Sequence, residues 1–431
     1  MRRNWLLLST SVAVVVSAAA AIAWTEHRAA RAEQLVGDAR ERLFASLTEA
    51  PELDRLQAST AQSLLERARA YGRDGDEVDG LDHFAGAIVD IQRGDLLLAE
   101  GEVTAARQRI GWTPELRLLA AEIARRRTDT EAARAHVETA LGEAPDHTRL
   151  LLLSADIALD RDDTDLATEL LERLVSLEPD CAAVHNRLGV ARLARGDDVA
   201  AERSLRRATD LDGRDPDAWV NLGRVMRRRG DHEGAKTAFD AAVARASGRS
   251  DAHLGRGLAR AALGDVDGAA HDFERAGELA PNDAEPLLAL GDLLRDLGRV
   301  DDAIATYRAA LTREDADAAS WLKLGNALVL AGEGSRAATA FREAIRRAPE
   351  LAAAHNGLGA ALMIATDHAG ASDALARAAA LDASDPNPLM NLALLLERTG
   401  DRDGARDAWR LALERDPASD VARTRLSRLG G

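Results

Sequence analysis

The residues that could carry chemistry in this chain are ten histidines, one cysteine and many carboxylates. Because Cys181 is the only cysteine among 431 residues, the chain has neither an intramolecular disulfide nor a zinc site with paired cysteines. The motifs HExxH, GxSxG and GxxxxGK(S/T), which are typical of zinc proteases, serine hydrolases and phosphate-binding loops, do not occur. We therefore expect no enzyme, no cofactor and no metal site.

The spacing of three histidines indicates packing rather than ligation. His185, His253 and His355 lie 68 and 102 residues apart, which are two and three times 34. They therefore occupy the same position of a repeated unit, where other units carry a tryptophan or leucine. We expect them to replace an aromatic side chain in the core. We expect Cys181, at a junction between units, to be a small buried filler.

A fixed period of 34 residues organises most of the chain. Alanine recurs at this interval at Ala133, Ala167, Ala201, Ala235, Ala269, Ala303, Ala337, Ala371 and Ala405. A unit of this size cannot bury its own apolar face, so the copies must stack on each other. We number each unit from its first residue and call the positions places 1 to 34. The units start at 114, 148, 182, 216, 250, 284, 318, 352 and 386.

The pattern within a unit predicts two helices that approach each other closely. Places 4, 7, 8 and 11 share one face of a first helix, and places 20, 24 and 27 share one face of a second helix. Glycine is frequent at place 8, although it costs about 1 kcal/mol in a helix interior. Place 24 carries large side chains such as Phe239 and Phe341. Glycine at place 15 and proline at place 32 are expected to end the two helices.

The repeated motif resembles that of a known family. Residues 219–226 read WVNLGRVM, and Ala235, Phe239 and Ala242 follow with the spacing A-x3-F-x2-A. This pattern is similar to the tetratricopeptide repeat, or TPR. The resemblance covers residues 114–419 as nine units, about seven-tenths of the chain. It implies an all-α, right-handed superhelical solenoid.

The segments outside the nine units have their own expected roles. Residues 80–113 look like a degenerate tenth TPR unit. Residues 25–79 are expected to form a membrane-proximal helical segment, with a linker at 72–80. Residues 420–431 are expected to form the polar capping helix that the end of a solenoid requires.

The resemblance also implies a binding surface, because TPR proteins hold partner proteins or peptides in a concave groove. The first helices line this groove at places 2, 5, 6, 9, 12 and 13. The candidate groove residues at these places are Asn186, Arg187, Asn221, Arg224, Arg227, Arg228, Lys323, Asn326, Asn356 and Asn391. Arginine suits the carboxylates of a partner, and asparagine can bind an extended backbone. The alternative is that these are ordinary solvated residues. The lysine and asparagine set of clamp-type relatives that hold chaperone tails is incomplete here.

The charge of the chain excludes one class of partner. The formal net charge is −16, with 72 acidic and 56 basic residues. Nucleic-acid binding needs a positive surface, so we expect no nucleic-acid partner. Acidic and basic residues are interspersed, and we expect most of them to lie on solvated helix faces.

The N-terminus predicts attachment to a membrane. Residues 5–24 read WLLLSTSVAVVVSAAAAIAW, twenty residues without a charge, and Arg2 and Arg3 precede them. A helix of this length spans a bilayer core of about 30 Å. We expect residues 1–24 to form a single-pass anchor in the inner membrane, with the N-terminus cytoplasmic and the repeats in the periplasm. The alternative is a cleaved signal peptide, since Ala21 and Ala23 form a small-x-small site.

The sequence thus predicts a membrane-anchored scaffold without enzymatic activity, which binds partner proteins during envelope assembly, secretion or complex biogenesis. Two alternatives remain open at this stage. One is a structural protein that stacks as a homo-oligomer on the membrane through the exposed ends of its repeats and residues 25–79. The other is a soluble periplasmic adaptor released by signal cleavage.

Overall fold

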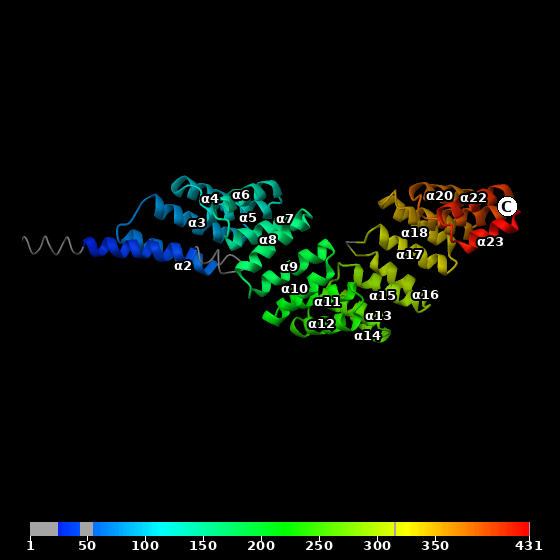
Figure 1. Ribbon diagram of the computed structural model, residues 1–431, viewed down its shortest axis with the longest axis horizontal. Coiled ribbons are helices and arrows are strands. Elements are labelled where there is room, and N and C mark those ends of the chain that lie inside the picture. Colours follow the sequence, from blue (N-terminus) through cyan, green and yellow to red (C-terminus); the bar gives the residue numbers. More distant parts are fainter. Residues whose placement is uncertain (1–24, 44–54, 314–315, 431) are drawn as a thin grey trace, which may run out of the picture. The chain divides into compact units, whose positions relative to one another are not determined.

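The computed structural model describes residues 25–43, 55–313 and 316–430, and it is helical throughout these segments (Figure 1). The described segments contain no strand, in agreement with the predicted all-α class. None of their helices is long and apolar enough to cross a bilayer. The anchor predicted at 5–24 lies outside the described residues.

The helices follow the predicted units. The first helices of the nine units are α5 (Pro114–Arg126), α7 (Thr148–Asp160), α9 (Ala182–Arg195), α11 (Pro216–Arg228), α13 (Ser250–Ala262), α15 (Glu285–Asp296), α17 (Ala318–Leu330), α19 (Ala352–Ile364) and α21 (Asn387–Thr399). The second helices are α6 (Thr130–Glu143), α8 (Thr164–Leu177), α10 (Asp198–Leu211), α12 (His232–Arg245), α14 (Val266–Leu279), α16 (Val300–Ala310), α18 (Gly334–Arg347), α20 (His368–Leu381) and α22 (Arg402–Arg415).

Further helices flank the nine pairs. A helix over 25–43 and α2 (Arg55–Ala70) precede the pair α3 (Asp76–Arg93) and α4 (Leu96–Ile110), and α23 (Asp420–Arg428) follows α22. The linker expected at 72–80 is shorter than predicted, because α3 already begins at Asp76. Three carboxylates in its first turn, including Asp76 and Glu77, favour a helix start there.

The chain divides into two compact units, Met1–Asp212 and Gly213–Gly431. Within each unit, a first helix packs against its own second helix and against the next pair. First helices also contact first helices, as α5 contacts α7 in the first unit and α17 contacts α19 in the second. Each compact unit is therefore a stack of helix pairs.

Glycine at place 8 explains how closely the helices of a pair approach each other. A Cβ atom added to Gly325 would lie 2.6 Å from the ring of Phe341, and one added to Gly223 would lie 2.8 Å from the ring of Phe239. Both rings are completely buried. Phe341 also meets Gly357 of the next repeat, where an added Cβ would clash with the ring carbons, so the ring is held between two glycines. The predicted interlocking of places 8 and 24 is confirmed.

Turns and junctions repeat with the same chemistry in most of the pairs. The glycines at place 15, such as Gly230 and Gly332, have φ of 81° and 76° and stop the first helix. Aspartates at place 16, such as Asp231, accept a hydrogen bond from the backbone N–H three residues later and cap the second helix. Second helices end two residues before the place-32 prolines, as α18 ends at Arg347 before Pro349.

Candidate protein-binding surface

The candidate surface is the side of each unit on which the first helices lie next to each other. We call it the first-helix face and define it by places 2, 5, 6, 9, 12 and 13. These places fall on one side of each first helix. All ten predicted groove residues lie on this face. Asn186 and Arg187 belong to the first compact unit and the other eight to the second, so the two faces are described separately.

In the second compact unit, Gly213–Gly431, α11 contributes a basic group to the first-helix face. Arg224, Arg227 and Arg228 are exposed at its end. Nη1 of Arg224 donates to Oδ1 of Asn221 at 3.5 Å, and Nη2 lies 3.4 Å from Oδ2 of Asp251 on α13. The structure thus brings together the predicted residues of α11. It adds Asp251 at place 2 as their acidic neighbour.

A hollow of about 480 Å³ lies beside this basic group. Arg224 and Arg227 line it together with acidic residues from α13 and the start of α15, and Phe239, Leu254 and Leu258 supply apolar lining. Burial alone would raise the pKa of Asp251, but hydrogen bonds from Arg249 and the charge of Arg224 lower this pKa below its ordinary value. Asp251 therefore stays ionised, and the hollow offers both signs of charge above an apolar floor.

In the first unit, Arg187 belongs to a different hollow, of about 570 Å³. Its Nε atom donates to Oδ1 of Asp156 on α7 at 3.3 Å. Burial raises the pKa of Asp156, although the charges of Arg187 and Arg125 oppose the rise. Arg125, Arg126 and Arg149 also line this hollow.

The sequence analysis missed these three arginines. They occupy places 12, 13 and 2 of the units that start at 114 and 148. The rule that selected Arg224, Arg227 and Arg228 also selects them, so applying it to every unit would have found them.

Lys323, one of the predicted groove residues, is partly buried and forms an ion pair with a neighbouring first helix. Its Nζ atom donates to Oδ2 of Asp292 on α15, while the hydroxyl of Tyr307 donates to Oδ1 of Asp292 at 2.6 Å. Arg295 pairs with the same carboxylate. Lys323 therefore lies on the first-helix face with its charge paired to Asp292.

The three asparagines of α17, α19 and α21 remain on the first-helix face. Asn326 is exposed. Nδ2 of Asn391 donates to Oδ1 of Asn356 at 2.9 Å, so these two amides join neighbouring first helices. The pair uses one donor and one acceptor and leaves further hydrogen-bonding capacity on both side chains.

The three histidines at place 4 make the same structural contact, but only His253 among them is buried in the core. Nε2 of His185 lies 2.9 Å from the carbonyl oxygen of Pro179, and His253 and His355 make the same contact with the carbonyl six residues earlier. Nε1 of Trp219 donates to the carbonyl of Gly213 in the same way, at 3.0 Å. Cys181 is only half-buried, as the N-cap residue of α9, rather than fully buried. Among the described residues, no cluster of three or more potential metal ligands exists.

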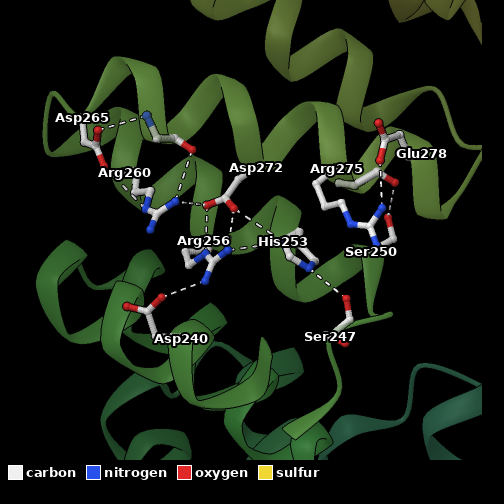
Figure 2. A network of polar contacts seen from close by, with 12 residues as sticks. Asp240, Ser247, Ser250, His253, Arg256, Arg260, Asp265, Asp272, Arg275 and Glu278 are labelled. Atoms are coloured by element: carbon white, nitrogen blue, oxygen red, sulfur yellow. Dashed lines mark hydrogen bonds and ion pairs between the residues drawn. The ribbon is translucent and has the colours of Figure 1, made fainter. Parts of the chain in front are cut away.

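A buried network of charges lies mainly within the 34-residue repeat that starts at 250 (Figure 2). Asp272 on α14 is completely buried and accepts from Arg256 at 2.6 and 2.9 Å and from Arg260 at 2.8 Å. Arg256 also donates to Asp240 of the preceding unit at 2.9 Å. Burial would lower the pKa of Arg256, yet the hydrogen bonds to Asp272 and Asp240 raise it above its ordinary value. The network therefore consists of paired charges that join α13 to α14 and to the preceding repeat.

Helix pairs that stack in register and expose the faces of their first helices define a class, the helical-repeat scaffolds. Sequence models of the tetratricopeptide repeat family match residues 199–248, 220–284, 288–352 and 322–388, and further models described in the same words match 124–189 and 389–419. The chain belongs to the tetratricopeptide repeat family. No curated protein is similar to it in sequence.

Several solved structures are similar to this chain. A crystal structure of the APC/C hetero-tetramer Cut9–Hcn1 is 16% identical over 86% of this chain and 87% of the matched chain, with a TM-score of 0.45. MamA is 27% identical over 37% of this chain and 94% of its own, with a TM-score of 0.35. The pilF protein of Pseudomonas aeruginosa is 15% identical over 49% of this chain and 97% of its own, with a TM-score of 0.45. All three TM-scores are below 0.5, so these structures do not indicate a partner for this chain.

Proposed function

We propose that this protein is a non-enzymatic scaffold that binds partner proteins on the first-helix face of its second unit. Residues 5–24 hold it in the inner membrane, and the repeats face the periplasm, where they serve envelope assembly, secretion or complex biogenesis. Membership of the tetratricopeptide repeat family supports protein binding as the activity. The charge-free run at 5–24 supports the anchor.

The observation that carries the proposal is the exposed basic group of α11 beside a hollow that is lined by charged and apolar side chains. In a chain of net charge −16, Arg224 and Arg227 keep their guanidinium groups at the surface. Leu258, which is partly exposed, supplies apolar surface to the same hollow. Guanidinium groups next to apolar surface suit a protein segment with a carboxylate and an apolar side chain.

The test is a crosslinked pull-down from membranes with the full chain. We expect specific partner proteins with the wild type and their loss with Arg224→Glu combined with Arg227→Glu. The matched control is Arg308→Glu with Arg342→Glu, which changes the net charge equally on exposed positions of the second helices α16 and α18. The proposal fails if both variants retain the partners or if both lose them.

The position of the protein in the cell has a separate test. A retained anchor predicts an intact mass that includes residues 1–24 and a chain that stays with the membrane after a carbonate wash. A mature protein that begins after Ala23 would replace the anchor by a cleaved signal, and the adaptor would be soluble in the periplasm.

A further inference from the structure

The first-helix face changes character along the second unit. On α11, four of the six defining places carry a charged residue, namely Asp217, Arg224, Arg227 and Arg228. On α19, none of the six does, and on α17 the single charged residue is Lys323, which is bonded to Asp292. In a chain that is 30% charged, such a run of uncharged places needs an explanation.

Apolar side chains occupy this uncharged part of the face. Leu330 at the end of α17 is 62% exposed, and Ile364 at the same place of α19 is 40% exposed. Val329 and Met363 lie next to them and are partly buried against the core. We call Val329, Leu330, Met363 and Ile364 the apolar window. An exposed apolar patch bordered by polar residues is typical of a protein-docking site.

Charged residues border the window on both sides and differ in sign. Place 13 carries Asp296 on α15, Leu330 on α17, Ile364 on α19 and Arg398 on α21. These helices contact each other in that order. The carboxylate of Asp296 is 69% exposed and pairs only with the adjacent Arg295, and such exposed pairs are weak. The row therefore reads acidic, apolar, apolar, basic.

The spacing of this row selects the conformation of its occupant. Neighbouring packed helices lie about 8–10 Å apart, so the four positions extend over about 30 Å. In an α-helix, residues seven apart share one face and lie about 10 Å apart along the axis. In a β-strand, a step of about 10 Å is three residues, which places alternate side chains on opposite sides. A helix thus matches the row, and a β-strand does not.

We propose that the apolar window binds an amphipathic helix of a partner protein that crosses α15, α17, α19 and α21. The helix spans about 22 residues. It carries apolar side chains seven residues apart in its middle, a basic side chain over Asp296 and an acidic side chain over Arg398. The methionine of the window adapts to the shape of such apolar side chains. This inference rests on the proposed function and specifies the chemistry of the partner.

The test uses synthetic helical peptides of about 22 residues and the full chain, with binding followed by fluorescence anisotropy. Each peptide carries leucine at its eighth and fifteenth positions. One peptide has lysine at the first and glutamate at the last position; a second has lysine at both ends and a third glutamate at both ends. We expect the wild type to bind the lysine–glutamate peptide at least about tenfold more tightly than the other two, a difference of about 1.4 kcal/mol.

Two protein variants make the test specific to the window. Arg398→Asp gives the row two acidic ends, so the preference should change to the peptide with lysine at both ends. Leu330→Glu with Ile364→Glu should weaken every peptide at least about tenfold. The matched control is Leu166→Glu with Leu411→Glu, at positions that are 41% and 48% exposed outside the window, and it should bind like the wild type.

Each outcome decides the inference. An unchanged peptide preference in Arg398→Asp overturns it, and so does tighter binding of a proline-containing peptide that cannot form a helix. If the wild type sediments as a dimer that Leu330→Glu with Ile364→Glu dissociates, a second copy covers the window and the inference is wrong. Loss of the partner in Arg224→Glu with Arg227→Glu, together with no peptide binding, would retain the proposed function and reject this inference alone.

Discussion

At the scale of single residues, four of the nine repeats make the same hydrogen bond from place 4, although the side chain is a histidine in three of them and a tryptophan in the fourth. Trp219 donates from its indole nitrogen to the carbonyl of Gly213, and His355 presents Nε2 to the carbonyl of Pro349 at 2.9 Å. Because a carbonyl oxygen only accepts, Nε2 is the protonated nitrogen of His355 in this contact. Tryptophan and histidine both carry a ring N–H, so either residue can make this contact, whereas Leu151, Leu287 and Leu389 at the same place cannot.

A substitution at this place tests the donor directly. We expect His355→Phe to lower the free energy of unfolding by about 1 kcal/mol, because the carbonyl of Pro349 loses its partner. His355→Trp restores an N–H donor and should stay closer to the wild type. Urea unfolding followed by circular dichroism measures both. Equal stability of the two variants would show that ring packing alone matters at place 4.

At the scale of the helix pair, the residue at place 15 of the turn adopts the left-handed backbone conformation whether or not it is glycine. Six units carry glycine at place 15, whereas Thr128, Asp162 and Thr366 occupy it in the other three. These three have φ of 62°, 61° and 63°. The turn between the two helices imposes this conformation, in which the Cβ atom of a non-glycine residue is sterically unfavourable. A β-branched threonine is poorly suited to it.

The turn therefore contains a stabilising substitution. Thr366→Gly should raise the free energy of unfolding by about 1 kcal/mol, since relief of a left-handed side chain outweighs the greater entropy of glycine in the unfolded chain. The control is Thr339→Gly at an exposed position inside α18, which should lose about 1 kcal/mol. Thermal unfolding of both variants measures the difference. A loss of stability in Thr366→Gly would contradict the argument.

At the scale of the whole molecule, the sequence predicts the repeated features and misses those that occur once. The 34-residue period sets the helix pairs, and the contact of Gly325 with Phe341 follows from place 8 and place 24. The linker at 72–80 was overestimated, because the acidic first turn of α3 has no counterpart in the period.

The site was harder to predict than the fold. The place rule found Arg224 and Arg227 but says nothing about pairing, so it could not show that Asp292 takes the charge of Lys323. That contact joins residues 31 positions apart on neighbouring helices, and only the packed structure brings them together. A periodic pattern determines which side of a helix a residue occupies, but not which partner it finds there.

The buried network of Asp272 allows a test of whether a substitution destabilises only the repeats next to it. Asp272→Ala leaves Arg256 and Arg260 buried without their main partner and should cost about 3–5 kcal/mol. In a repeat protein, each unit gains its stability from its own pair and its neighbours. Hydrogen exchange should therefore quicken in α12 to α15 and remain unchanged in α5 and α6.

The control for this prediction comes from the repeats that start at 318, 352 and 386, which carry leucine at places 7 and 11 and alanine at place 23, as in Leu324, Leu328 and Ala340. The triple variant Arg256→Leu, Arg260→Leu and Asp272→Ala recreates that apolar arrangement and should regain the stability of the wild type or exceed it, because no buried charge is left unpaired. Hydrogen exchange that quickens uniformly along the chain in Asp272→Ala would mean that the stack unfolds as one cooperative body rather than repeat by repeat.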